Sequence, residues 1–316
     1  AAAAAIGGTM APIELEEGYD KDYVAAVNIA SAPTGQLIPP SNTLIVYATV
    51  AGSVSVAALF MAGYIPGIAW GISLMFIAGY MAKKRGYVST FSVTPKEAIK
   101  VLWDALPSLL LIIIVIGGIL KGVFTATEGS AIAVVYALIL SLCYRSLKIK
   151  DLPSIILSSC KTTCIVIFMI GVSSIMSWVM AYTMIPTAIA NAMLSLSSNK
   201  YVILLLMNVI LLVVGTFMDP TPAVLIFTPI FLPICQSFGM DPVQFGIMIV
   251  FNLCIGTITP PVGVILFTGC KVVGISIEGV IKTLLPFFAA IAVVLLLVTY
   301  VPAMSMWIPS MLGLVK

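Results

Sequence analysis

Long apolar runs, separated by short polar or basic stretches, make up most of this chain. Runs long enough for a helix that crosses a bilayer lie at about 58–82, 106–122, 127–145, 162–182 and 283–302. Further apolar pieces lie at 1–12, 184–197, 201–218 and 222–235, and a short amphipathic helix is expected from Thr94 to near Pro107. This pattern predicts an all-α polytopic membrane protein.

Two more apolar runs, at about 23–50 and 243–270, each contain a pair of adjacent prolines. The prolines stand in Gly-Gln-Leu-Ile-Pro-Pro-Ser-Asn at 35–42 and in Gly-Thr-Ile-Thr-Pro-Pro at 256–261. Proline has no backbone N–H, so each pair breaks the helix and frees two carbonyls of the preceding turn. The carbonyls concerned are those of Gly35, Gln36, Gly256 and Thr257. In a bilayer such groups must be buried in protein or bound to something.

The two broken runs belong to an internal repeat. Moving residues 1–60 along the chain by 221 positions lays them on 222–281, and prolines, glycines and aspartates coincide. The pairs include Pro12 with Pro233, Gly18 with Gly239, Asp20 with Asp241, Pro39 with Pro260 and Ser55 with Ser276. The basic loops at 83–100 and 145–161 should be cytoplasmic. If 201–235 is a hairpin that enters and leaves on one face, the repeats are inverted.

Composition supports a membrane protein and excludes a soluble one. The chain has 316 residues, of which 61% are hydrophobic and 9% charged, and it contains no histidine. Its net charge of +3 is scattered, which gives no reason to expect a nucleic-acid partner. The six cysteines lie in or beside apolar runs and are interpreted as packing residues. The opening Ala-Ala-Ala-Ala-Ala is neither a signal peptide nor a natural start, so we expect a fragment begun partway through a membrane domain.

The freed carbonyls predict a site for a small hard cation. Backbone oxygens with the hydroxyls of Thr257 and Thr259 nearby are the donors that such a cation prefers, and unwound transporter helices bind coupling ions in this way. With no buried histidine or carboxylate pair at the breaks, the coupling ion is expected to be sodium, Na⁺, and not a proton. The alternative is a simple proline kink that neighbouring helices satisfy.

Ser41, Asn42 and Thr43 follow the first proline pair, at the N-terminal end of a half-helix whose dipole attracts anions. The corresponding residues 262–264 offer no side-chain hydrogen bonds, so substrate contacts should lie mainly in the first repeat. No lysine or arginine stands beside either proline pair. An anionic substrate would therefore be held by helix dipoles, hydroxyls and bound cations. Ser41 could equally serve as a helix cap.

Asp219 is the most deeply embedded acid in the sequence, and two interpretations of it stay open. An ionisable residue inside a membrane segment is a functional candidate by default, so Asp219 is a candidate substrate-binding residue. Aspartate followed by Pro220 is also typical of an N-cap with proline in the first helical turn. A membrane aspartyl protease would need a second facing aspartate, and Asp219 alone lies deep enough.

Five stretches resemble one family. One is early, from Gly-Tyr-Asp-Lys-Asp-Tyr at 18–23 through Leu-Ile-Pro-Pro-Ser at 37–41. The others are Gly-Thr-Phe-Met-Asp-Pro at 215–220, Thr-Pro-Ile-Phe-Leu-Pro at 228–233, Gly-Met-Asp-Pro-Val-Gln-Phe-Gly at 239–246 and Gly-Thr-Ile-Thr-Pro-Pro-Val-Gly at 256–263. With them the chain resembles the large membrane subunit of TRAP transporters (tripartite ATP-independent periplasmic transporters). The resemblance implies a sodium-coupled importer of organic acids in the bacterial inner membrane, not an enzyme, that works by an elevator mechanism. It also implies a small membrane subunit, separate or fused, and a periplasmic substrate-binding protein.

Carried over by position, the resemblance gives expected site residues and domains. The expected sodium ligands are Gly35, Gln36, Pro39, Gly215, Thr216, Met218, Gly256, Thr257, Thr259 and Pro260. The expected parts are 1–82 (second arm of a first re-entrant hairpin, broken helix and span), 83–200 (connecting helices) and 201–316 (second re-entrant hairpin, broken helix and last span). C4-dicarboxylate and sialic acid type substrates both stay open, and a re-entrant-loop ion channel subunit is the alternative function.

Overall fold

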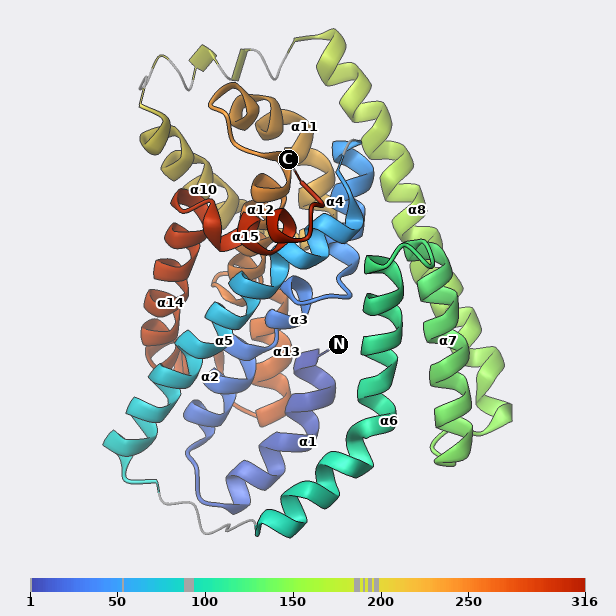
Figure 1. Ribbon diagram of the computed structural model, residues 1–316. Coiled ribbons are helices and arrows are strands. Elements are labelled where there is room, and N and C mark those ends of the chain that lie inside the picture. The colour runs from blue at the N-terminus through green and yellow to red at the C-terminus, as the bar shows by residue number, and fades with distance from the viewer. Residues whose placement is uncertain are drawn as a thin grey trace. The chain divides into compact units, whose positions relative to one another are not determined.

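The computed structural model describes residues 2–52, 54–87, 94–184, 188–189, 191–192, 195 and 199–315, which form helices joined by turns (Figure 1). Within these ranges seven helices are long and apolar enough to cross a membrane. These spans lie in α5 (Val56–Arg85), α6 (Pro95–Leu120), α7 (Ala126–Cys143), α8 (Leu152–Tyr182), α10 (Lys200–Phe217), α11 (Pro220–Ser237) and α14 (Ile277–Tyr300). The chain is a polytopic all-helical membrane protein, as predicted. Most of the predicted segment 184–197 lies outside the described residues.

The chain divides into two compact units. The first, here called the repeat unit, combines residues 1–89 with 175–316 and so brings the two predicted repeats together. The second, the connecting unit, consists of residues 90–174, with α6, α7, the short 3₁₀ turn Ile149–Asp151 and the first part of α8.

Several helices of the two repeats start at corresponding residues. The first repeat contains α1 (Ala2–Glu16), α2 (Lys21–Ser31), α3 (Thr34–Leu37) and α4 (Asn42–Ala51); the second contains α11, α12 (Pro242–Ile258) and α13 (Val264–Val273). The starts of α2 and α12 are 221 positions apart, as are those of α5 and α14. Asp20 and Asp241 stand at the N-caps of α2 and α12, and Ser55 and Ser276 cap α5 and α14. Both proline pairs contain a cis peptide bond.

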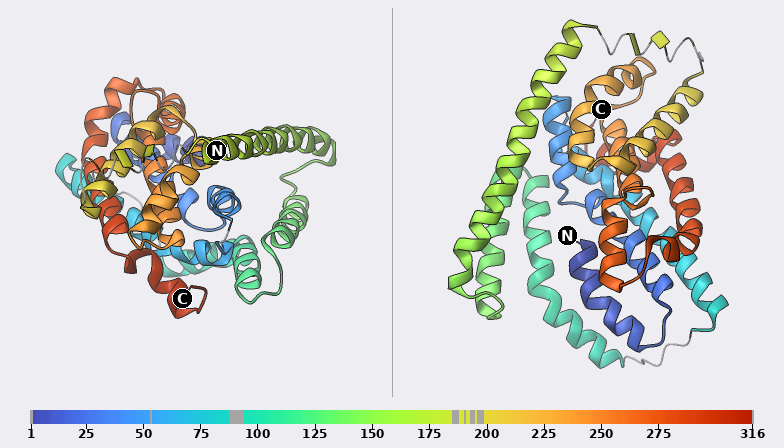
Figure 2. Two further views of the ribbon diagram at one scale, coloured as in Figure 1. Left: turned by 90° about the horizontal axis from the view of Figure 1, so that it is seen from above. Right: turned by 180° about the vertical axis from the view of Figure 1, so that it is seen from behind.

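The repeats also pack reciprocally. Helix α1 packs against α13, and its counterpart α11 packs against α4, the counterpart of α13. Figure 1 and the right-hand view of Figure 2 place α1 with α13 toward the lower end of the repeat unit and α11 with α4 toward the upper end. An exchange of partners of this kind is what an approximate two-fold axis produces.

Helix α12 is the centre of this packing. Every residue from Val243 to Ile258 is buried, as expected for a helix that is apolar on all sides. Its one asparagine, Asn252, donates to the side-chain oxygen of Asn208 on α10 (2.8 Å), and Asn208 donates to the Thr299 hydroxyl on α14 (3.0 Å). This hydrogen-bonded chain ties three helices together inside the core.

Two sequence predictions about the first repeat are wrong in detail. Helix α1 does not end at Pro12 but continues to Glu16, because a proline ring is compatible with helical φ and removes a single hydrogen bond. The first broken helix is interrupted twice. It stops before Pro33, restarts as the one-turn α3, and breaks again at the paired prolines. A third proline with no N–H explains the extra interruption.

In the connecting unit, the predicted amphipathic helix and the span after it form one helix, α6, which runs through Pro107. The predicted capping box of Thr94 and Glu97 is present at its start. Apolar flanks hold the helix together across Pro107, since membrane helices tolerate proline. Helix α8 begins at Leu152, ten positions before the predicted 162. The remaining spans agree with the predicted ones to within a few residues at each end, except that α14 begins at Ile277.

Candidate functional site

The second break lies in backbone contact with the last turn of α10. A Cβ placed on Gly256 of α12 would lie 2.4 Å from the Cα of Gly215 on α10 and 2.6 Å from its carbonyl oxygen. No side chain larger than hydrogen fits there, so the two helices cross with their backbones touching. The structure thereby brings together Gly215, Thr216 and Gly256, which are far apart in the sequence and were all expected at a cation site.

Gly263 closes the second break. Its φ of 48° is a left-handed conformation that glycine adopts easily, and its N–H donates to the Thr216 carbonyl at 3.2 Å. A Cβ on Gly263 would lie 2.9 Å from the Thr259 carbonyl oxygen and 3.2 Å from that of Thr257. Both carbonyl oxygens therefore lie close to the glycine, which has no side chain to cover them.

The threonine hydroxyls at this break donate their hydrogens back into their own helices. The Thr257 hydroxyl donates to the Cys254 carbonyl, and the Thr259 hydroxyl to the Ile255 carbonyl, both at 2.7 Å. The hydroxyl oxygens keep lone pairs, so they can still act as acceptors or cation ligands.

The predicted free carbonyls divide into two kinds. That of Gly256 accepts the Thr259 N–H at 3.0 Å, and that of Gln36 accepts the Ser41 hydroxyl. Those of Gly35 and Thr257 receive no hydrogen bond from the residues that the structure describes. The expectation of four free carbonyls is thus wrong for two of them, because short local hydrogen bonds replace the ones that proline removes.

The first break is organised around Ser41. Its buried hydroxyl oxygen accepts the Leu44 N–H at 3.3 Å, which caps α4. The capping interpretation of Ser41 is therefore confirmed, and its role toward substrate stays a prediction. Asn42 is exposed in the first turn of α4, whereas Thr43 is buried. Pro39 is buried within the break itself.

Each break adjoins a cavity of different character. Beside the first is one of about 240 Å³, lined by Gly7, Asn28, Ser31 and Gly35 among others. Beside the second is a larger, apolar one of about 490 Å³, whose lining includes Thr216, Phe217, Thr259, Pro260 and Pro261.

The two breaks are linked across the repeat unit. The Cys254 thiol on α12 donates to the side-chain oxygen of Gln36 at 3.1 Å, a contact between residues 218 positions apart.

Asp219, next to Met218 in the turn between α10 and α11, is exposed and accepts the Thr221 N–H at 3.1 Å. It is therefore the N-cap of α11, and this geometry leaves a further role of its carboxylate untested.

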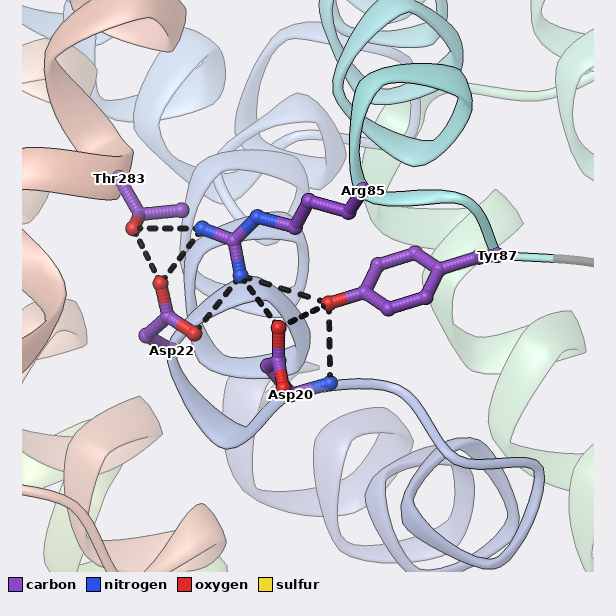
Figure 3. Close-up of polar contacts among 5 residues, drawn as sticks. All are labelled: Asp20, Asp22, Arg85, Tyr87 and Thr283. Carbon is purple, nitrogen blue, oxygen red and sulfur yellow. Dashed lines mark hydrogen bonds and ion pairs between the residues drawn. The ribbon is translucent and has the colours of Figure 1, made fainter.

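A polar cluster that the sequence did not predict joins α2, α5 and α14 (Figure 3). The Arg85 guanidinium donates to both oxygens of Asp22, at 2.9 and 2.7 Å, and to Asp20 at 3.0 Å. Tyr87 donates to Asp20, and Thr283 donates to Asp22. Hydrogen bonds from Arg85 lower the pKa of Asp22 to about 2. The acidic loop and the basic end of α5 were visible in the sequence, but nothing local showed that they meet.

Among the described residues, no three histidine, cysteine, aspartate or glutamate side chains converge on one point.

A helical membrane chain with two repeats, each broken at paired prolines, has the architecture of a secondary transporter. The family model of the tripartite ATP-independent periplasmic transporter, DctM component, matches residues 1–304. The chain belongs to this family.

Three relatives align with nearly the whole chain. The chain is 52% identical over 311 residues to the uncharacterized protein YgiK of Salmonella typhimurium, covering 98% of this chain and 72% of YgiK. It is 40% identical to the isethionate TRAP transporter permease protein DctMQ of Oleidesulfovibrio alaskensis, covering 97% of this chain and 48% of that protein. It is 36% identical to the C4-dicarboxylate TRAP transporter large permease protein DctM of Pseudomonas aeruginosa, covering 99% and 74%.

Proposed function

We propose that this chain is the large permease subunit of a sodium-coupled importer that carries an organic acid across the bacterial inner membrane. A small membrane subunit, separate or fused, and a periplasmic protein that delivers the substrate would complete the transporter. Relatives named for isethionate and for C4-dicarboxylates support a small organic anion as substrate. A sialic acid, expected from the resemblance, belongs to the same class of organic acids.

The observation that carries this proposal is the pairing of two proline breaks within one reciprocally packed unit. Transporters built on inverted repeats bind substrate and ions where their helices are unwound, at the interface between the repeats. At the second break, the carbonyl oxygens of Thr257 and Thr259, both close to Gly263, would be ligands for sodium. At the first, the carbonyl of Gly35 offers a further ligand.

The substrate would lie at the start of α4. Its first-turn N–H groups, at Asn42 and Thr43, have no partner within the helix and attract an anion. Coupling then has a simple electrostatic basis. With neutral side chains at the breaks, bound sodium supplies the positive charge that the anion needs, so each ligand favours binding of the other.

The resemblance implies how the bound substrate crosses the membrane. In this proposal α10 and α11 form a re-entrant hairpin, and the repeat unit is the domain that moves in an elevator mechanism. The backbone crossing of Gly215 with Gly256 would then keep the hairpin turn beside the bound ions during movement.

The proposal is tested by uptake into vesicles that contain the full-length transporter, supplied with its periplasmic protein. Succinate, isethionate and N-acetylneuraminate serve as labelled probes. Uptake of at least one should be saturable and should collapse when sodium is replaced by potassium or choline at fixed pH. Full uptake on a proton gradient alone would contradict sodium coupling, and a non-saturable ion current would indicate the channel alternative.

A further inference from the structure

Equivalent positions of the two repeats meet at one residue, Cys254. Gln36 and Thr257 stand 221 positions apart, the spacing of the repeat. The Cys254 thiol donates to the Gln36 side-chain oxygen at 3.1 Å, and the Cys254 carbonyl accepts the Thr257 hydroxyl at 2.7 Å. Cys254 itself is fully buried.

This meeting locates Gln36 within the fold. Residues that a two-fold axis relates, and that touch the same third residue, must both lie close to that axis. In transporters built from inverted repeats, the substrate also lies near the axis, at the interface of the repeats. Gln36 therefore lies close to the interface of the repeats, although it was expected to contribute its backbone carbonyl alone.

The hydrogen bonds around Gln36 leave one group unused. Its backbone carbonyl accepts the Ser41 hydroxyl, and its side-chain oxygen accepts the Cys254 thiol. Because the thiol supplies the hydrogen, the –NH₂ group of the amide points away from Cys254. The Gln36 side chain is partly exposed, and its Nε2 donates to no acceptor in the part of the chain that the structure describes.

We propose that the Gln36 amide donates a hydrogen bond from Nε2 to the anionic group of the substrate, and that Cys254 is a positioning residue that fixes the orientation of this amide. The inference rests on the proposed function, because it needs an anionic substrate at the breaks. An amide donor suits a carboxylate or a sulfonate, since it offers N–H without adding charge. Charge compensation is then left to the co-transported cations, which makes substrate binding depend on them.

The test compares variants in the vesicle assay, using whichever of succinate, isethionate and N-acetylneuraminate the wild type takes up. Gln36→Leu should raise the KM for that probe by about 10- to 100-fold, the loss expected for a hydrogen bond to a charged acceptor. The maximal rate and the sodium concentration for half-maximal uptake, measured at saturating probe, should change less than twofold. Gln36→Glu should raise the KM further, because it replaces a donor by a like charge.

Two further variants separate a direct contact from a structural effect. Cys254→Ala should raise the KM by about 3- to 10-fold, since it releases the amide while keeping the donor. Gln236→Leu makes the same chemical change at an exposed position of α11 and should leave the KM unchanged.

The outcomes distinguish this inference from the proposed function. A wild type that takes up none of the three probes with sodium overturns the proposed function and this inference with it. A transporting wild type with a Gln36→Leu KM within twofold of its own overturns this inference alone. So does a Gln36→Leu variant in which the maximal rate falls and the KM does not rise, because that pattern indicates a structural role.

Discussion

The two proline breaks share a backbone plan and differ in what surrounds it. Gly35 and Gly256 occupy corresponding positions of the repeat, yet a Cβ on Gly256 would collide with Gly215, whereas one on Gly35 would meet nothing within 4 Å. The second break is packed against a neighbouring helix turn and lined by threonine oxygens. The first is capped by a serine and adjoins a small cavity.

This difference shows how one repeated device can take two roles. The packed break has fixed oxygens, which suit an ion that needs definite distances. The first break is followed by a serine-capped helix N-terminus, which suits an anion. In this view the repeat supplies backbone geometry, and the side chains added afterwards divide the binding of ion and substrate.

The largest expected effect comes from exchanging the corresponding glycines for alanine. Gly256→Ala forces α10 and α12 apart and should destabilise the protein by about 1–3 kcal/mol or more. Gly35→Ala should be neutral or stabilising by up to about 1 kcal/mol, because it removes glycine flexibility in an open, helical position. Thermal unfolding of both variants in detergent measures the contrast. Equal Tm values would show that the second break is not closely packed.

Ser41→Ala should lower the free energy of unfolding by about 1–3 kcal/mol. It removes a helix cap and leaves the Gln36 carbonyl without its hydrogen-bond donor. Ser55→Ala is the matched control, because Ser55 also caps a helix, α5, with its hydroxyl. Both variants should lower the Tm, but Ser41→Ala alone should also raise the KM of uptake. A KM unchanged in both would leave Ser41 as a cap.

Asp219→Ala should lower the free energy of unfolding by about 0.5–2 kcal/mol, because it removes the N-cap of α11. Asp219→Asn should keep the cap and so keep this stability. Uptake then separates the cap from a functional carboxylate. An asparagine variant that folds normally but does not transport would establish the need for charge beside the second break. Asp241→Asn is the control, since Asp241 caps α12 in the same way, also before a proline.

The smallest expected effect concerns the Arg85 cluster, in which Asp22 corresponds by repeat position to the apolar Val243. The pKa of Asp22 is lowered to about 2 in the folded protein. Its contribution to the free energy of unfolding is therefore fully present above the unfolded pKa of about 4. That contribution is lost as the pH falls from about 4 to 2. Partly exposed ion pairs contribute below about 1 kcal/mol. Between about pH 4 and pH 2, the Tm of the wild type should therefore fall slightly more than the Tm of Asp22→Asn. Parallel pH profiles would contradict this.

Local sequence signals predicted most helix boundaries. Helix ends lie at the Asp-Pro and Ser caps and at the paired prolines. They recur at the repeat spacing of 221 positions for the starts of α2 and α12 and of α5 and α14. The signals failed at Pro12 and Pro107, where helices continue. Proline removes one donor wherever it stands, but whether the helix continues depends on the packing and apolar length on both sides, which a local pattern does not contain.

For the site, the residue types alone identify the carbonyls that could lose their hydrogen-bond partners, because proline lacks an N–H wherever it stands. The packing of the chain then gave two of these carbonyls other donors. The Gln36 carbonyl accepts the Ser41 hydroxyl, and the Gly256 carbonyl accepts the Thr259 N–H. It also decided that Gly215 touches Gly256 and that Cys254 meets Gln36 from 218 positions away. Such contacts depend on how all the helices pack together, and the same backbone chemistry at two breaks is compatible with many packings. The sequence therefore determined the breaks, and the packing of the helices decided what each break faces.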